Sequence, residues 1–176
     1  MMNTRSKHST PLDFEELVNK YYQPLYRFAY SLSKQESDAA DLTQETFLIW
    51  AQKGHTLRDP SKVKSWLFTT LYRAFLGQYR RNQRELTQDE SIIENLNPSF
   101  SPNWSERLDA RQAVELMDTI NPVYRAPLTL FYLQDLSYKE IAEILGIPIG
   151  TVMSRLSRGK AQLKQKLSEK APKDST

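Results

Sequence analysis

The sequence contains no cysteine, which excludes a disulfide framework and a thiolate metal site. Its only histidines, His8 and His55, do not form the helical pair that commonly holds a metal ion. It also lacks a glycine-rich phosphate loop and a Ser/His/Asp arrangement, so little in it supports an enzyme. We therefore expect no metal, no cofactor and no small-molecule substrate.

Long apolar runs are missing as well. No segment approaches the roughly 20 apolar residues that a helix needs to cross a bilayer. The N-terminal stretch "MMNTRSKHSTPLD" also lacks the apolar region of a secretory signal. These absences predict a soluble cytoplasmic protein that is not embedded in a membrane.

The 176 residues that are present suffice for one medium-sized or two small domains. Hydrophobic residues make up 39% of the chain, which favours a packed core over wholesale disorder. The net charge is only +3, but the charges are segregated. The charged residues of 151–173 are nearly all basic, and those of 85–112 are mostly acidic. Segregated charge suggests two parts with different partners, although a solvated helix surface explains such runs equally well.

Helical periodicity dominates, and no run of alternating β-branched residues predicts a strand. In the first half of the chain, helices are expected over about 12–32, 37–52 and 61–84. The first helix opens with Asp13 and Glu16 at capping-box spacing, and Pro24 should bend it. Residues 54–60 are expected to form a loop.

The stretch "LTQDESIIENLNPSFSPNWSE" is rich in Ser, Asn and Pro and has little periodicity, so it predicts a linker. A helix should resume near Glu106 and run toward Ile120. Asn121 and Pro122 then supply a cap and a first-turn proline for the next helix. The sequence thus predicts an all-α protein of two small helical domains, residues 10–85 and 106–170, with a flexible acidic linker at 86–105.

The C-terminal stretch "LSYKEIAEILGIPIGTVMSRLSRGKAQLKQKL" predicts a helix-turn-helix. Ser137 and Glu140 have capping-box spacing, and Gly146 suits the left-handed residue that ends a helix. Pro148 then opens a second helix in which Gly159 should allow close helix contact. The apolar stripe of that second helix consists of Val152, Leu156, Leu163 and Leu167.

The opposite arc of the second helix carries small residues between hydrogen-bond donors, which suits approach to a DNA groove. Arg158 and Gln165 could reach bases or phosphates, and Arg155 lies on the shoulder of the stripe, where a backbone contact is expected. The residues assigned to DNA are Ser154, Arg155, Ser157, Arg158 and Gln165. A plain helical hairpin is the alternative, and the narrow apolar face disfavours a membrane-surface helix.

Residues 124–163, "YRAPLTLFYLQDLSYKEIAEILGIPIGTVMSRLSRGKAQL", resemble the second conserved domain of bacterial RNA polymerase sigma factors. That domain holds the promoter −35 element. Nearly every position of the pattern L-S-Y-x-E-I-A-x-x-L-G-x-P-x-G-T-V-x-S-R-L is met. Response regulators and repressors also contain a helix-turn-helix, so the first lobe has to decide between them.

In the first lobe, "DAADLTQETFLIWAQK" at 38–53 resembles the sigma segment that grips core polymerase, with its D-L-x-Q-E-x-F signature. Asp38, Asp41 and Glu45 form a negative stripe on the helical wheel, with Gln44 beside Asp41. The arc assigned to the core contains Ala40, Phe47 and Ala51. The resemblance implies that Asp41, Gln44 and Glu45 bind a coiled coil of the polymerase β′ subunit, and that the β flap is a further contact. An ordinary solvated acidic face is the alternative.

The third expected helix, "SWLFTTLYRAFLGQYRR" at 65–81, resembles the sigma segment that opens and reads the −10 element. Its apolar face is assigned to the core and consists of Phe68, Tyr72, Phe75 and Tyr79. Trp66 instead shares a narrow arc with Arg73, Arg80 and Arg84. A melted strand needs cations for its phosphates and aromatic surfaces for its bases, and this arc supplies both. The alternative is that Trp66 packs under a neighbouring segment with only its edge exposed.

The loop "LRDPSK" at 57–62 matches the family loop that accepts a flipped −10 base. The resemblance assigns base contact to Arg58, Asp59, Ser61 and Lys62. The chain departs from the family pattern at two positions: Arg73 stands where asparagine is usual, and Met153 where Lys or Arg is common. Both positions concern which promoter is read.

The match covers both lobes, and a two-domain chain is typical of the extracytoplasmic-function group, whose members are held inactive by an anti-sigma factor. The resemblance therefore implies a promoter-specificity subunit that binds core RNA polymerase and promoter DNA, recognises −35 and melts −10. It would not be an enzyme itself. The alternative is a stand-alone helix-turn-helix regulator, which would bind a duplex operator tightly without polymerase.

Overall fold

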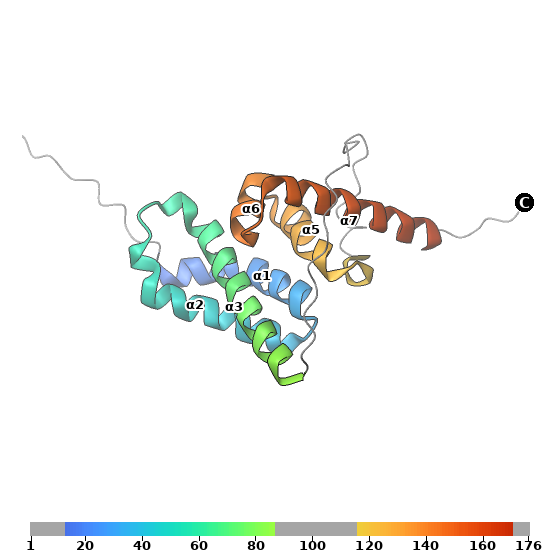
Figure 1. Cartoon of the computed structure of the whole chain (residues 1–176). Helices are drawn as coiled ribbons and strands as arrows, with labels where there is room; N and C mark the ends of the chain where they lie inside the picture. Colours follow the sequence, from blue (N-terminus) through green and yellow to red (C-terminus); the bar gives the residue numbers. More distant parts are fainter. Residues whose placement is uncertain (1–12, 87–115, 171–176) are drawn as a thin grey trace, which may run out of the picture.

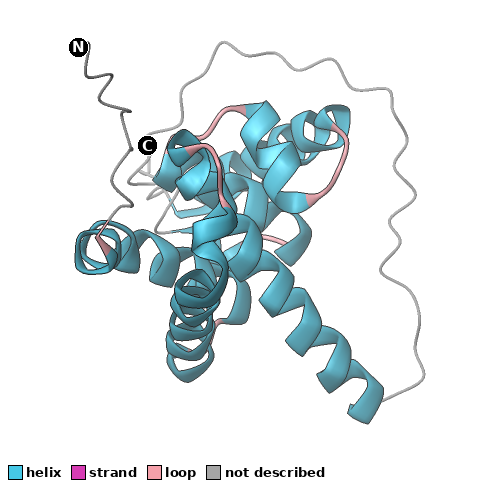
Figure 2. Cartoon of the chain, turned by 90° about the vertical axis from the view of Figure 1, so that its left-hand side faces the viewer, coloured by secondary structure: helices cyan, strands magenta, loops and turns pink. Residues whose placement is uncertain are grey.

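The computed structural model describes residues 13–86 and 116–170, which contain six α-helices and no strand (Figure 1, Figure 2). The first lobe consists of α1 (Phe14–Ser33), α2 (Glu36–Lys53) and α3 (Val63–Leu86), with 3-10 turns η1 (Gly54–Thr56) and η2 (Pro60–Lys62) before α3. The second lobe consists of the 3-10 turn η3 (Met117–Thr119), α5 (Pro122–Gln134), α6 (Tyr138–Leu145) and α7 (Ile149–Lys170). The all-α prediction is confirmed. The expected linker beyond Leu86, and most of the helix expected from Glu106, lie outside the described residues.

The ends of α6 follow the predicted local signals. Glu140 accepts a hydrogen bond from the backbone N–H of Ser137 at 2.9 Å, and the Ser137 hydroxyl accepts one from the Glu140 N–H at 3.3 Å. This capping box satisfies two backbone donors that the first turn would otherwise leave unpaired. Gly146 ends the helix at φ 65°, in the left-handed region that favours glycine.

The starts of the other helices are more mixed. Asn121 caps α5, since its side-chain oxygen accepts a 3.0 Å hydrogen bond from the Val123 N–H. Asp13 precedes α1, but its side chain makes no cap hydrogen bond, so the capping box expected with Glu16 is not formed. The helix continues through Pro24 as a single element.

The first lobe buries its core between α1, α2 and α3. The Phe28 and Phe68 rings meet at 5.5 Å between centroids, and Phe68 is fully buried, as predicted. Tyr79 is 42% exposed, so its assignment to the core was wrong. It lies near the end of α3, which extends past the other two helices (Figure 1). Ala51 is also exposed, so its assignment to the core was wrong. The buried face of α2 contains Leu42 and is rotated around the helix from the arc that was assigned to the core.

The second lobe packs α7 closely against α5. The predicted apolar stripe of α7 is confirmed: Val152, Leu156 and Leu163 are fully buried. Gly159 lies at the closest approach, where a Cβ atom would come within 2.7 Å of Leu128 Cδ1. A larger residue would force the two helices apart, so the glycine sets their spacing.

The two lobes are docked together, with α1 against α5 and α3 against α6. The Lys64 ammonium donates to the backbone carbonyl of Gln134 at 2.6 Å. Arg125 is buried and donates to the backbone carbonyl of Ser31, the last turn of α1, at 3.3 Å. No described helix has both the length and the apolarity needed to span a bilayer.

Candidate nucleic-acid interface

One face of α2 carries the residues predicted to bind polymerase. Asp41, Gln44 and Glu45 are all exposed, and Gln44 and Glu45 lie about one turn after Asp41. Leu48 continues the same face at spacings of four and three residues from Gln44 and Glu45, and it is 59% exposed. Sequence reasoning missed this leucine, although its spacing from the acidic pair could have identified it.

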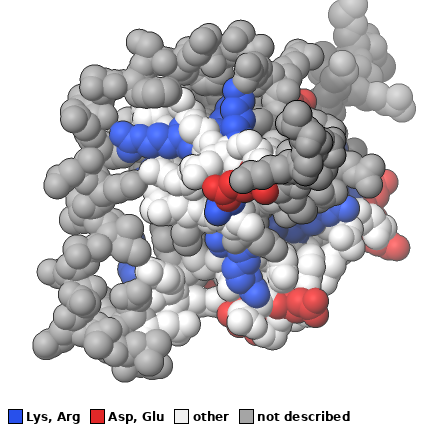
Figure 3. Space-filling model, turned by 90° about the vertical axis from the view of Figure 1, so that its right-hand side faces the viewer, with Lys and Arg blue, Asp and Glu red and all other residues white. Residues whose placement is uncertain are grey.

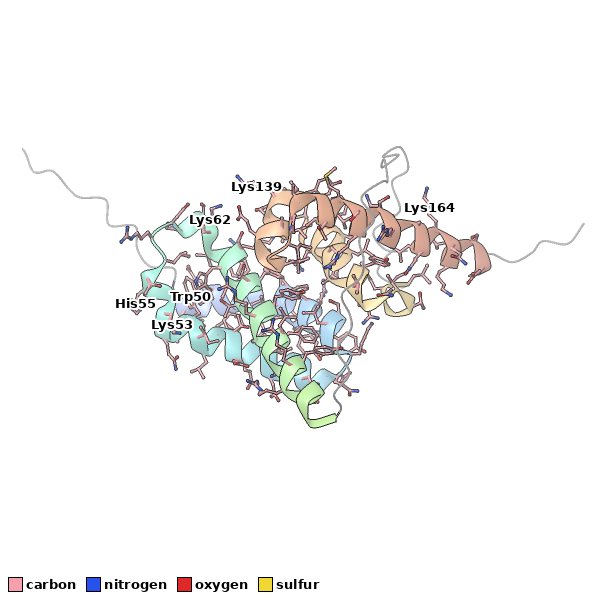
Figure 4. All side chains as sticks on the ribbon, viewed as in Figure 1. Trp50, Lys53, His55, Lys62, Lys139 and Lys164 are labelled. Carbon is pink, nitrogen blue, oxygen red and sulfur yellow. The ribbon has the colours of Figure 1, made fainter. Side chains whose placement is uncertain are left out.

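A pocket of about 260 Å³ opens beside the first turns of α3. It brings together three residues predicted to bind the −10 element: Lys62, Trp66 and Arg73. Leu57 and the small side chains of α3 complete this side of the pocket. Glu143 reaches the same pocket from α6, so the second lobe supplies part of its wall. Figure 4 labels Lys62, the last residue of η2, just before α3.

The loop before α3 is shaped by a local cap. The Asp59 carboxylate accepts hydrogen bonds from the Ser61 N–H at 2.9 Å and from its hydroxyl at 2.7 Å. These bonds, more than the nearby Lys62 charge, hold the pKa of Asp59 below its usual range. Arg58 is exposed in the same loop. Asp59 and Ser61 therefore fix the loop on which Arg58 and Lys62 are presented.

Trp66 is half-buried, and its indole meets that of Trp50 edge to face, with 5.2 Å between ring centroids and 75° between planes. The two interpretations of Trp66 are therefore compatible. One part of the side chain packs on α2, and the residue also lines the open pocket. The sequence did not indicate Trp50 as its neighbour.

Arg80 of α3 lies away from the pocket. Arg80 is exposed two turns after Arg73, about 10 Å further along the helix. It continues the same face, because seven residues nearly complete two turns. The side chain of Arg84 lies outside the described residues.

On α7, Ser154, Ser157 and Arg158 are half-buried and Gln165 is exposed. The Gln165 amide donates to Glu169 at 3.1 Å, so it is held by a local contact. Figure 3 views the side of the molecule on which α7 ends, and lysine and arginine side chains are prominent there.

Arg155 differs from the other predicted DNA-binding residues of α7. Its Nε is buried and has no hydrogen-bond partner among the described residues. It lies near Tyr72 of α3: burial raises the pKa of Tyr72, and the Arg155 charge lowers it by a smaller amount. Arg155 therefore faces the first lobe, and the structure does not place it beside Gln165.

Within the described part of the chain, no group of three or more His, Asp or Glu residues is placed to hold a metal ion. The arrangement instead offers an acidic face, an aromatic pocket with cations and a basic helix. These suit binding to protein and nucleic acid.

Comparison with known proteins supports the same interpretation. The family Sigma-70 region 2 matches residues 17–85, and the family Sigma-70, region 4 matches residues 110–163. The ECF RNA polymerase sigma factor SigM of Bacillus subtilis is 32% identical over 154 residues, which cover 87% of this chain and 94% of SigM. The ECF RNA polymerase sigma factor SigE of Mycolicibacterium smegmatis is 35% identical over 162 residues, 89% of this chain but only 62% of SigE.

Solved structures show the same fold. The sigma factor RpoE of Bartonella quintana, in complex with the anti-sigma factor NepR, has a TM-score of 0.68 and 29% identity, with 90% of this chain and 98% of that chain covered. CnrH, in complex with the cytosolic domain of CnrY, has a TM-score of 0.61 and 21% identity, with 90% and 89% covered. At that identity the CnrH likeness concerns the fold alone.

Proposed function

This chain belongs to the extracytoplasmic-function group of the sigma-70 family, and we propose that its two lobes divide promoter recognition between them. It is a promoter-specificity factor that joins core RNA polymerase in the cytoplasm and directs the start of transcription. Bond formation belongs to the polymerase. The observation that carries the residue-level proposal is the pocket that joins Lys62, Trp66 and Arg73.

The exposed face of α2 is the proposed contact with the β′ coiled coil. Asp41, Gln44 and Glu45 supply negative charge and hydrogen-bonding groups, which orient the two proteins and speed their encounter. Leu48 supplies an exposed apolar side chain beside them, and burying a leucine side chain in an interface contributes about 1.5–3 kcal/mol.

The pocket beside α3 is the proposed site for the melted −10 strand. Trp66 offers a surface on which an unpaired base can stack, which stabilises the complex by about 1–3 kcal/mol per base. Lys62 and Arg73 neutralise phosphates beside it, and Arg80 extends the track along α3. Together these contacts offset part of the free energy needed to unpair a few base pairs.

The second lobe is the proposed reader of the −35 element. The capped α6 supports α7, whose Ser154, Ser157, Arg158 and Gln165 face the major groove. The two reading units correspond to residues 10–85 and 106–170. Joining two weak sites in one chain raises the effective concentration of the second once the first is bound.

An anti-sigma factor is the proposed regulator. RpoE of Bartonella quintana, which shares 29% identity with this chain, was solved with the anti-sigma factor NepR. The docked lobes of this chain adopt the same overall fold. We propose that a protein of this kind holds the chain away from polymerase until it is needed.

Run-off transcription with core polymerase tests the proposal, on promoter fragments selected from the source genome with the reconstituted holoenzyme. The double variant Asp41→Ala/Glu45→Ala should fail to bind core polymerase. Trp66→Ala should bind core but open DNA poorly. Glu15→Ala/Glu16→Ala, which removes two exposed acids from α1, is the matched control and should transcribe normally. Tight binding to duplex DNA by a chain that never associates with polymerase would instead identify a stand-alone regulator.

A further inference from the structure

The strand-binding tryptophan of α3 is held by a second tryptophan. Trp50, in the last turn of α2, is half-buried and meets Trp66 edge to face at 5.2 Å. Figure 4 labels Trp50 at this end of α2, near His55. Edge-to-face contact is a preferred geometry for aromatic pairs because the positive ring edge meets the negative ring face. The contact therefore restricts how the Trp66 indole can turn.

Gly54 makes room for the Trp50 indole. This residue ends α2 and is buried, and its φ of −60° is open to any amino acid. Space is the constraint, because a Cβ atom at this position would lie 2.6 Å from Cδ2 and Cε2 of Trp50. Those are rigid ring atoms, so any larger residue would have to displace the indole.

Trp50 lies on the opposite side of α2 from the proposed polymerase contact. Nine residues separate it from Asp41, which places the two about 180° apart around the helix. Asp41 is exposed, whereas Trp50 packs inward against α3. A change at Trp50 can therefore alter Trp66 without touching the acidic face.

We propose that Trp50 is a positioning residue for promoter melting. It fixes the Trp66 indole at the angle at which an unpaired −10 base can stack, and Gly54 leaves the space that the Trp50 indole occupies. This inference rests on the proposed function of Trp66. Stacking requires the base and the indole to lie face to face, so a tryptophan free to turn presents its face only part of the time. Trp50 removes that freedom before DNA arrives.

The test compares Trp50→Phe, Trp50→Leu and Gly54→Ala in the full chain, each alone and combined with Trp66→Ala. Holoenzyme is assembled on a promoter selected with the wild type, and melting is measured by permanganate reactivity of unpaired thymines. Core binding is measured separately. In a Trp104→Phe background, the near-ultraviolet circular dichroism of the coupled indoles reports directly on the Trp50–Trp66 geometry.

We expect Trp50→Leu and Gly54→Ala to reduce the permanganate reactivity of the −10 thymines roughly 5- to 50-fold. This range corresponds to the loss of part or most of one base-stacking interaction. Trp50→Phe should fall between Trp50→Leu and the wild type, since it keeps part of the aromatic edge. Core binding should be unchanged. On the Trp66→Ala background none of the three should reduce melting further, because their effect passes through Trp66.

Equal losses with and without Trp66 would overturn the positioning role and identify Trp50 as general support of the lobe. Unchanged melting in a variant whose indole signal has disappeared would also overturn it. Failure of the wild type itself to bind core polymerase would be a different result, because it would contradict the proposed function.

Discussion

The side chain of Lys64 in α3 and the backbone carbonyl of Gln134 at the end of α5 are joined by a 2.6 Å hydrogen bond. The carbonyl lies at the negative end of the α5 dipole, where a cation is favoured. Seventy residues of chain separate the two partners, so this bond ties one lobe to the other. The relative position of the two lobes therefore depends in part on the Lys64 side chain.

Replacing Lys64 should loosen the docked lobes. Lys64→Met keeps the aliphatic stem but loses the charged donor, which should lower the free energy of unfolding by about 1 kcal/mol. Lys64→Arg retains a donor and serves as the control. Urea denaturation gives the free energy, and small-angle scattering should show a larger radius of gyration for Lys64→Met alone. An unchanged midpoint and radius would contradict a stabilising role for this bond.

Removing the charge of Glu143 should favour strand binding by the free protein. Glu143 lines the pocket that contains Trp66 and Arg73, so its carboxylate opposes an incoming phosphate. We expect Glu143→Gln to tighten binding of a single-stranded −10 oligonucleotide about 2- to 5-fold at low salt. Glu15→Gln, an exposed acid on α1, is the matched control. Equal gains from both variants would indicate net charge instead of a local effect.

Leu48 should matter to polymerase binding and little to folding. Because the side chain is 59% exposed, Leu48→Ala should change the melting temperature little. If its side chain is buried against polymerase, its truncation should weaken core binding by about 1–2 kcal/mol, as measured by fluorescence anisotropy with labelled protein. Unchanged affinity, under conditions where Asp41→Ala weakens binding, would place Leu48 outside the interface.

Two glycines of α7 offer a matched test of the α5–α7 contact. Gly159→Ala places a methyl group 2.7 Å from Leu128, which should destabilise the second lobe by about 1–3 kcal/mol. Gly150→Ala meets nothing within 4 Å and should be neutral or stabilising by up to about 1 kcal/mol. Thermal denaturation of both variants, beside the wild type, gives the comparison. Similar losses from both would show that helix flexibility matters more than helix spacing.

The Ser137–Glu140 capping box should make α6 sensitive to acid. Hydrogen bonds from Ser137, with smaller effects of Lys64 and Lys62, hold the pKa of Glu140 below its usual range. A carboxyl whose pKa is lowered by folding stabilises the fold above its unfolded pKa and loses that stabilisation as pH falls through the folded pKa. Glu140→Gln should therefore lower the melting temperature at pH 7 and lower it by less near pH 3. A loss that stays the same at both pH values would exclude the ionised carboxylate as its source.

The sequence predicted those features that depend on neighbouring residues. The cap at Ser137, the left-handed Gly146 and the stripe containing Leu156 are set within one or two helical turns, and the structure has all three. The acidic face of α2 is also a local pattern, and its exposure follows from the helical period. The same reasoning failed at Tyr79, because periodicity does not show where a partner helix ends.

Contacts between distant segments could not be predicted in this way. A helical wheel places Arg155 on the shoulder of α7, but it does not show that α3 lies opposite with Tyr72. The role of Trp50 was hidden for the same reason, since Trp66 comes from another helix. The sequence did contain one local signal for the Trp50–Gly54 contact. Trp50 stands four residues before the glycine that ends the helix, and at this spacing the glycine lies against the indole ring.

The bonds of Arg125 have a consequence for how such chains diverge. Its guanidinium donates to the backbone carbonyls of Ser31, Met117 and Ile120, at 3.3, 3.2 and 2.9 Å. Every residue type carries a backbone carbonyl, so substitutions at these three positions leave the acceptors in place. Arg125 itself cannot be replaced in this way, because a fork of donors is needed to reach three carbonyls in two segments, the end of α1 and the η3 turn. Homologues that keep this lobe arrangement should therefore retain the arginine, whereas packing in the buried core, and not these hydrogen bonds, should limit substitution at the three acceptor positions.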